Sequence, residues 1–328
     1  MNLNKPLSFG LIFVAFLALK ACSTSLATPT NHWFSPADIS PEFGAPSQSS
    51  TRLLGVLELH SQPSADADIS ELSGLAWHES SQTLFGITDR GILHRFRPSF
   101  QDDELTGLHW LGQVYLKGED GKPLSRSWED SEGIAIWRNG DDPELLVSFE
   151  VRPRLVRYSV EGTWLGELAL PPTHSSIDHY GSANGALEAL TVHPELGWVT
   201  GAERPMNTDQ GQLRLIAQSN WSQSFSPDPD EHSALTGMTT AENGDLVFLE
   251  RRFNGLLVPL QIRVRRIRPG SNEAPKTIAL FDNAAGWRMD NFEGISRHRG
   301  NRYFAVSDDN GNPLQRALLI YFEIAEPS

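Results

Sequence analysis

Five related stretches of sequence predict an all-β propeller for most of this chain. Beyond residue 50 the chain consists of short apolar runs separated by Gly, Asn, Asp and Pro, without a long segment of helical period. The stretches begin at Glu71, Asp130, Ala186, Ala234 and Asn291, and each contains two apolar strands joined by a turn. Small residues near the start of the first strand recur 48 to 59 positions apart, at Gly74, Gly133, Ala189, Gly237 and Gly294. That spacing is typical of one four-stranded blade, so we predict five blades, or six if an insertion hides a degenerate copy.

The two ends of the predicted domain, residues 51–326, complement each other. The last repeat has only three strands and ends with ALLIYFEI at Ile324. An unmatched strand, Leu53 to Leu59, precedes the first repeat and resembles the outer strands of the other copies. Pairing this strand with the C-terminal blade closes the ring and removes an open sheet edge.

The first 22 residues are predicted to be a lipoprotein-type signal peptide. Lys5 precedes an apolar run from Leu7 to Leu19, which is short for a membrane span, and the run ends at Cys22, the only cysteine. Leu19, Ala21 and Cys22 resemble the lipobox of bacterial lipoproteins, in which the cysteine is lipidated. We expect export to the bacterial cell envelope, as an outer-membrane lipoprotein that faces the periplasm, or as a secreted or periplasmic protein if Cys22 is not lipidated. Residues 23–50, rich in Ser, Pro, Thr and Ala, are predicted to be a flexible tether.

Composition limits the partners of the chain. With 328 residues and 39% hydrophobic content, the chain is long enough for a sizeable core. A formal net charge of -14 argues against nucleic-acid binding, which needs a surplus of Lys and Arg on one face. We expect a monomer that contacts the membrane only through its lipid anchor and binds a small-molecule ester or phosphoester.

Acidic residues recur at two positions of the repeat. The residue before the small one is Ser73, Glu132, Glu188, Thr236 or Glu293, and the second strand ends at Asp89, Glu150, Glu203, Glu250 or Asp308. In an antiparallel pair the start of one strand lies beside the end of the next. Both sets are therefore predicted to meet at one mouth of the central channel, as a ring of up to eight carboxylates.

Converging carboxylates need compensation by cations or protons. Arg90, Arg152, Arg204 and Arg251 closely follow four of the second-strand acids, and we interpret these pairs as latches between blades. Glu132, Glu188 and Glu293 lack such a neighbour, so we predict that they are oxygen ligands of the kind that Ca²⁺ prefers. Farther along, the alternating run RVRRIRPG places Arg263, Arg265 and Arg268 on one strand face, which we expect to be solvated.

The motifs ELSGLAW, DSEGIA, NGALEALTV and DNFEGIS followed by SDDN resemble the bacterial phytase-like family, described by an esterase-like activity of phytase. The resemblance covers about Leu53 to Ile324. It implies a β-propeller related to calcium-dependent phytases, with Glu132, Glu188 and Glu293 in the acidic motifs and Asp89, Glu203 and Asp308 as second-strand partners. In such a site Ca²⁺ would activate water, and Arg90, Arg204 or Arg251 would bind substrate oxygens. Glu188 and Glu293 are then the candidate catalytic acids.

The polar insertion from His174 to Glu188 leads directly into the predicted mouth, and His179 is a further candidate for acid–base catalysis. The sequence has neither a G-x-S-x-G elbow nor an H-E-x-x-H zinc motif. We therefore predict a metal-dependent hydrolase of phosphate or carboxylic esters. The alternatives are a non-catalytic propeller that binds a ligand or protein in the cell envelope, and a lactonase-like calcium propeller.

Overall fold

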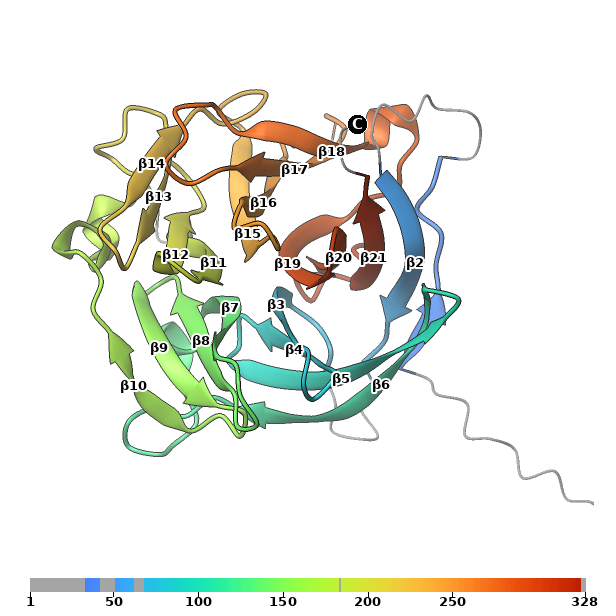
Figure 1. Cartoon of the computed structure of the whole chain (residues 1–328), viewed down its shortest axis with the longest axis horizontal. Helices are drawn as coiled ribbons and strands as arrows, with labels where there is room; N and C mark the ends of the chain where they lie inside the picture. Colours follow the sequence, from blue (N-terminus) through green and yellow to red (C-terminus); the bar gives the residue numbers. More distant parts are fainter. Residues whose placement is uncertain (1–32, 42–50, 62–67, 183, 256, 326–328) are drawn as a thin grey trace, which may run out of the picture. The chain divides into compact units, whose positions relative to one another are not determined.

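Each of the five sequence repeats forms one antiparallel sheet, and the sheets are arranged as the blades of a propeller (Figure 1). The computed structural model describes residues 33–41, 51–61, 68–182, 184–255 and 257–325. Blade 1 consists of β3 (Leu72–His78), β4 (Thr83–Thr88), β5 (Ile92–Gln101) and β6 (Glu104–Tyr115), and blade 2 of β7 (Ser131–Arg138), β8 (Glu144–Phe149), β9 (Arg154–Ser159) and β10 (Trp164–Leu168). Blade 3 consists of β11 (Leu187–His193), β12 (Gly197–Ala202), β13 (Leu213–Ala217) and β14 (Ser222–Phe225), and blade 4 of β15 (Ser233–Thr240), β16 (Leu246–Arg252), β17 (Gln261–Ile267) and β18 (Lys276–Asp282). The predicted five-bladed fold is confirmed.

Blade 5 joins the two ends of the domain, as the sequence predicts. It contains β19 (Asn291–Arg299), β20 (Arg302–Asp308) and β21 (Leu318–Ile324), followed by β2 (Thr51–Leu59). The antiparallel register between β2 and β21 runs from Thr51 opposite Ile324 to Glu58 opposite Leu318. Leu54 and Leu57 of β2 are buried against blade 1. The N-terminal strand therefore closes the ring by both hydrogen bonding and apolar packing.

A fifth strand extends this sheet, and it comes from the segment that the sequence analysis assigned to the tether. β1 (Phe34–Pro36) pairs with β2, with Phe34 opposite Leu59. Ile39, just beyond β1, is fully buried between blades 4 and 5, and its carbonyl accepts a hydrogen bond of 3.0 Å from the Arg288 amide. Apolar side chains at positions 34 and 39 thus attach this part of the segment to the propeller.

The predicted signal peptide and the lipidation of Cys22 lie outside the described residues. None of the helices in the described part of the chain has the length and apolar character that crossing a membrane requires. Those helices are 3₁₀ turns in the connections between blades: η2 (Arg126–Trp128), η3 (Pro172–His174), η4 (Ile177–His179) and η5 (Asn283–Ala285).

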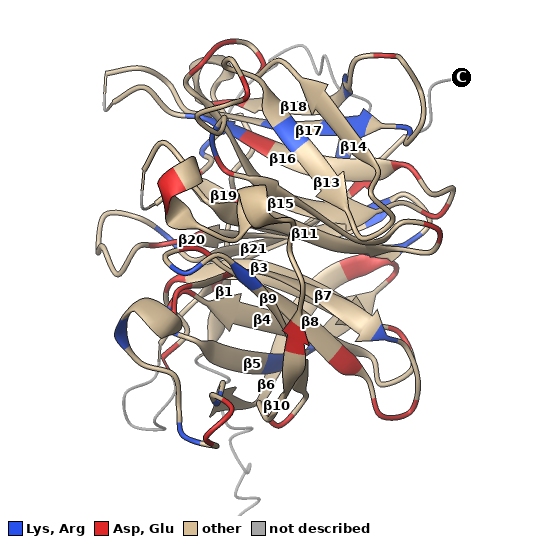
Figure 2. Cartoon of the chain, turned by 90° about the vertical axis from the view of Figure 1, so that its left-hand side faces the viewer, with Lys and Arg blue, Asp and Glu red and all other residues tan. Residues whose placement is uncertain are grey.

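Five hydrophobic clusters fill the spaces between neighbouring blades. Each cluster combines residues of two adjacent sheets, as where Phe281 of blade 4 meets Phe322 of blade 5 edge to face at 6.0 Å between ring centroids. Alternate residues of a strand point to opposite sheet faces, so every blade contributes to two clusters. On the side seen in Figure 2, acidic and basic residues are interspersed over strands and loops.

The small residues of the repeat lie where inner strands of adjacent blades approach one another. A side-chain carbon on Gly133 would lie 2.6 Å from Cβ of Leu190 and 2.7 Å from the carbonyl oxygen of Glu188. One on Gly74 would lie 2.5 Å from the carbonyl oxygen of Glu132, and one on Gly237 would overlap the carbonyl oxygen of Glu293. Glycine is required at these three positions because the backbone of the next blade occupies the space that a side chain would need.

This packing predicts that Gly237→Ala destabilises the protein more than an alanine in open space. Overpacking against backbone costs about 1–3 kcal/mol of unfolding free energy. Gly140→Ala is the matched control, because nothing lies within 4 Å of the added carbon. Urea unfolding of both variants is the measurement, and equal unfolding free energies would contradict the close-approach explanation.

Candidate metal centre at the channel mouth

A cavity of about 680 Å³ opens where the inner strands β3, β7, β11 and β19 begin. Among the described residues that line it, nine are acidic and one is basic: Asp89, Asp130, Glu132, Glu150, Glu188, Glu203, Asp290, Glu293 and Asp308, with Arg251. The structure thus gathers residues from the starts of first strands and the ends of second strands. We call this cavity the acidic mouth.

A β-bulge at the start of each inner strand places the acidic position. The register shifts between Leu187 and Ala189, between Phe292 and Gly294, and at the equivalent points of β3, β7 and β15. The extra residue in the first two cases is Glu188 or Glu293, and a bulge turns such a side chain out of the regular alternation. The sequence pattern predicts the acidic residue and the small residue of each repeat, but it does not predict this shift of the strand register.

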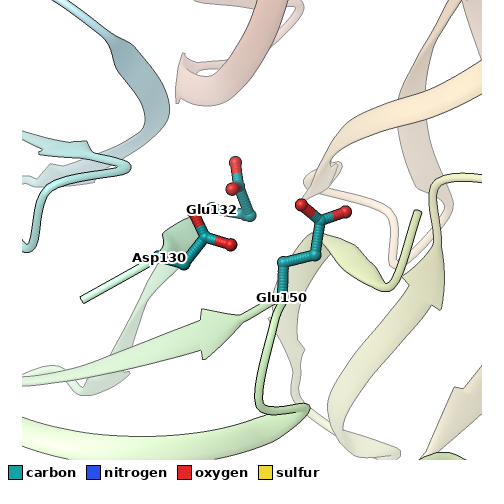
Figure 3. A group of neighbouring side chains, drawn as sticks. All are labelled: Asp130, Glu132 and Glu150. Carbon is teal, nitrogen blue, oxygen red and sulfur yellow. The ribbon is translucent and has the colours of Figure 1, made fainter. Parts of the chain in front are cut away.

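Two groups of carboxylates lie close enough to share a cation. The first consists of Asp130, Glu132 and Glu150, which come from one blade and face one space (Figure 3). The second consists of Glu150, Glu188 and Glu203. In each group one oxygen per residue lies within 4.8 Å of the others. Glu150 belongs to both groups and so connects blade 2 with blade 3.

Several oxygens of these carboxylates have no partner in the described part of the protein. Glu132 is 7% exposed and takes part in no described hydrogen bond or ion pair. Oε2 of Glu188 and Oδ1 of Asp89 are also buried without a hydrogen bond. Glu150 accepts a backbone hydrogen bond of 3.0 Å from the amide of Ala186. Buried anionic oxygens without donors fit a hard divalent cation such as Ca²⁺, which takes six to eight oxygen ligands.

Burial and mutual repulsion raise the pKa values of these acids. Burial, aided by neighbouring carboxylates, raises the pKa of Asp89 to about 7 and the pKa values of Glu150 and Asp308 to about 8. Burial, and then repulsion between carboxylates, raises the pKa values of Glu132 and Glu188 well above the ordinary value. Without a cation, the mouth therefore holds protons at neutral pH.

Arg251 is the internal counter-ion of the mouth. Its guanidinium pairs with Glu293 of blade 5 at 2.5 Å and with Glu203 of blade 3 at 3.1 Å, and it also bonds to the side chain of Asn291. Burial lowers the pKa of Arg251, but the surrounding glutamates outweigh this effect and raise the pKa above the ordinary value. Glu293, expected to lack an arginine neighbour, is thus paired with an arginine from the adjacent blade. Burial raises the pKa of Glu293, and Arg251 opposes that rise.

Glu250 differs from the other second-strand acids. It is fully buried, and it pairs with Arg265 at 2.6 Å and accepts a hydrogen bond from the amide of Asp228. It does not line the acidic mouth. The expectation that Arg263 and Arg265 lie on a solvated face was wrong, since both are buried. Arg265 lies inside the blade because it neutralises Glu250 there.

The other predicted substrate-binding arginines lie outside the cavity lining. Arg90 pairs with Asp68 at 2.8 Å and with Glu71, and half-buried Arg204 lies 3.7 Å from Glu203. His179 is exposed on η4 and also lies outside the lining. The insertion that carries it is held by the Tyr180 hydroxyl, which donates to the His174 carbonyl at 2.9 Å.

Two members of the carboxylate groups, Asp130 and Glu150, were not predicted as ligands. Glu150 was set aside because Arg152 follows it and was taken as its partner. In the structure, the Arg152 guanidinium instead lies over the Trp128 ring, 4.2 Å from its centroid, and bonds to Ser127. The DSEGIA motif contains both Asp130 and Glu132, so the sequence of the repeat offered a signal for Asp130 as a ligand.

A family model described as "Phytase-like: Esterase-like activity of phytase" matches residues 67–311. No curated protein matches the sequence. Among solved structures, the PQQ-bound form of aldose sugar dehydrogenase from Streptomyces coelicolor is similar with a TM-score of 0.43 and 14% identity, covering 87% of this chain and 100% of that chain. Selenomethionine-substituted virginiamycin B lyase from Staphylococcus aureus gives a TM-score of 0.40 and 11% identity, covering 89% of this chain and 100% of that chain. We draw nothing about chemistry from these two likenesses.

The raised pKa values predict how stability depends on pH. Without metal, the folded mouth binds more protons than the unfolded chain, so this stabilisation is complete below about pH 4 and disappears as pH rises through 7 to 8. We expect the melting temperature in the presence of chelator to fall from pH 5 to pH 8. We also expect Ca²⁺ to raise the melting temperature more at pH 8 than at pH 5. Scanning fluorimetry with NaCl of matched ionic strength is the measurement. An equal calcium shift at both pH values would contradict proton–metal competition.

The position of Arg251 predicts a large cost of removing it. Arg251→Gln leaves Glu203 and Glu293 without their counter-ion, and breaking a buried pair in this way costs about 3–5 kcal/mol of unfolding free energy. We expect Ca²⁺ to restore part of that loss, because it replaces the missing positive charge. Arg52→Gln, which removes an exposed pair with Glu323, is the control and should cost less than about 1 kcal/mol. Urea unfolding with and without Ca²⁺ tests this, and similar losses in both variants would argue against an internal counter-ion.

Proposed function

The chain belongs to the phytase-like family described by an esterase-like activity of phytase, and from this premise we propose that it is a metal-dependent hydrolase. Its substrate is a phosphate or carboxylic ester, which reacts at the acidic mouth. The observation that carries the proposal is the pair of carboxylate groups that share Glu150 and include a buried oxygen without a donor, Oε2 of Glu188. A latch between blades would pair its carboxylates with basic residues, whereas Glu132 has no basic partner among the described residues.

We propose Ca²⁺ as the metal, because every candidate ligand is a carboxylate oxygen and the described lining contains neither His nor Cys. Asp130, Glu132, Glu150, Glu188 and Glu203 would hold it. When bound, such a cation polarises an ester oxygen and lowers the pKa of water. Asp89 and Asp308 line the same cavity and remain candidates for further oxygen ligands.

Glu293 is the proposed general base. It lies outside both carboxylate groups, and its Oε1 is fixed by Arg251 and by the Asn291 amide at 2.8 Å. A carboxylate whose pKa is raised by burial and that is oriented in this way suits the role of a proton acceptor. Arg251 then acts as a positioning residue that orients Glu293 and keeps it available in its ionised form. His179, exposed and outside the lining, has no part in this proposal.

Glu132→Gln tests the hydrolase proposal. The substitution keeps the shape of the side chain and removes the charge, so we expect calcium affinity and calcium-dependent kcat/KM to fall by at least about tenfold. Calorimetry and turnover of phosphomonoesters, carboxylic esters and lactones, with Ca²⁺ and with chelator, are the measurements. Glu144→Gln is the control, because Glu144 lies at the start of β8 and pairs with Arg138 and Arg157. Calcium binding by a folded protein without turnover of any ester would refute the hydrolase and leave a ligand-binding propeller.

A further inference from the structure

Apolar side chains line one side of the acidic mouth. Phe253 and Leu260 flank the connection from β16 to β17, and Leu314 lies between β20 and β21. Phe253 is 47% exposed and Leu314 is 90% exposed. We call Phe253, Leu260 and Leu314 the apolar rim.

The rim differs from the other exposed apolar residues in the described part of the chain. Leu111 and Tyr115 lie on the outer strand of blade 1, Leu165 lies on the outer strand of blade 2, and Leu257 lies in the same connection as Phe253. None of these four lines the acidic mouth. Trp128 is covered on one face by Arg152. Isolated exposed apolar residues are ordinary, but apolar residues grouped at the edge of a polar cavity are typical of a ligand site.

The carboxylate groups and the apolar rim come from different blades, and Glu293 and Asp308 of blade 5 line the cavity as well. The carboxylate groups come from blades 2 and 3, whereas the apolar rim comes from blades 4 and 5. A cavity of about 680 Å³ has room for a ligand that touches both surfaces at once. Such a ligand needs a polar end for the cation-binding side and an apolar end for the rim.

The charges of the mouth argue against a substrate with many phosphates. Arg251 is the one basic residue in the described lining, and its two terminal nitrogens already pair with Glu293 and Glu203. No further guanidinium or ammonium group of that lining is available for additional phosphates. Nine acidic residues in the lining would repel them.

We infer that the acidic mouth selects an amphipathic ester, with one phosphate or carboxylic ester group at the carboxylate groups and an alkyl or aryl chain on the apolar rim. The inference rests on the proposed function for the ester group, and on the rim for the chain. A buried methylene contributes up to about fourfold in affinity, so a longer chain should bind more tightly until the rim is covered.

Binding of alkylphosphonates tests the rim without requiring turnover. We expect octylphosphonate to bind the calcium-loaded protein at least about tenfold more tightly than methylphosphonate in calorimetry. The double variant Phe253→Ser/Leu314→Ser should remove most of that difference. Leu111→Ser/Leu165→Ser, which changes two exposed leucines on outer strands, is the control and should retain it. Melting temperatures of both variants check that they are folded.

Turnover of p-nitrophenyl esters of increasing acyl length separates this inference from the proposed function. Chain-length-dependent binding without turnover of these esters or of phosphomonoesters would support the rim and refute the hydrolase. Turnover without dependence on chain length, or the same loss in both double variants, would overturn the rim alone. Failure of the calcium-loaded protein to bind any phosphonate or to cleave any ester would overturn both.

Discussion

The close approach of the inner strands at the channel axis constrains everything that surrounds it. The small residue of one blade packs on the carbonyl of the acidic position in the next, as Gly133 does on Glu188 and Gly74 on Glu132. The two features that recur in the sequence are therefore parts of one contact. The bulge beside this contact frees the acidic side chain from the sheet and directs it to the mouth.

That contact also concentrates negative charge. Because the inner strands begin close together, the acidic residues at their starts and at the ends of the second strands carry carboxylates a few ångströms apart, in a cavity where burial alone disfavours ionisation. Arg251 neutralises one side by spanning from Glu203 to Glu293. On the other side, Glu132 and Glu188 lack an arginine partner among the described residues, and protons or a cation must balance them.

The fold could be read from the sequence because blades repeat and small residues mark each repeat. The apolar strand from Leu53 to Leu59 indicated the closure, since its missing partner was visible at Ile324. The pairing of charges could not be read in this way. Long arginine side chains reach across strands and blades, so Arg251 meets Glu293 rather than only its own neighbours, Arg265 meets Glu250, and Arg152 turns to Trp128. β1 was missed because three residues give too short a pattern, and its contacts with β2 exist only after folding.

Because β2 closes the ring, the completion of the propeller depends on the order in which the chain is synthesised. β2 is synthesised before the four complete blades, yet its hydrogen-bonding partner β21 is the last strand to emerge, with Thr51 opposite Ile324. Four blades can form their own hairpins during synthesis, whereas the fifth cannot be completed before β21 has been made. Until then the ring is not closed, and the leucines of β2 are accessible to chaperones that bind incomplete chains. Ring closure is thus a late step of folding, because the pairing of β2 with β21 requires that the strands of all five sheets have been synthesised.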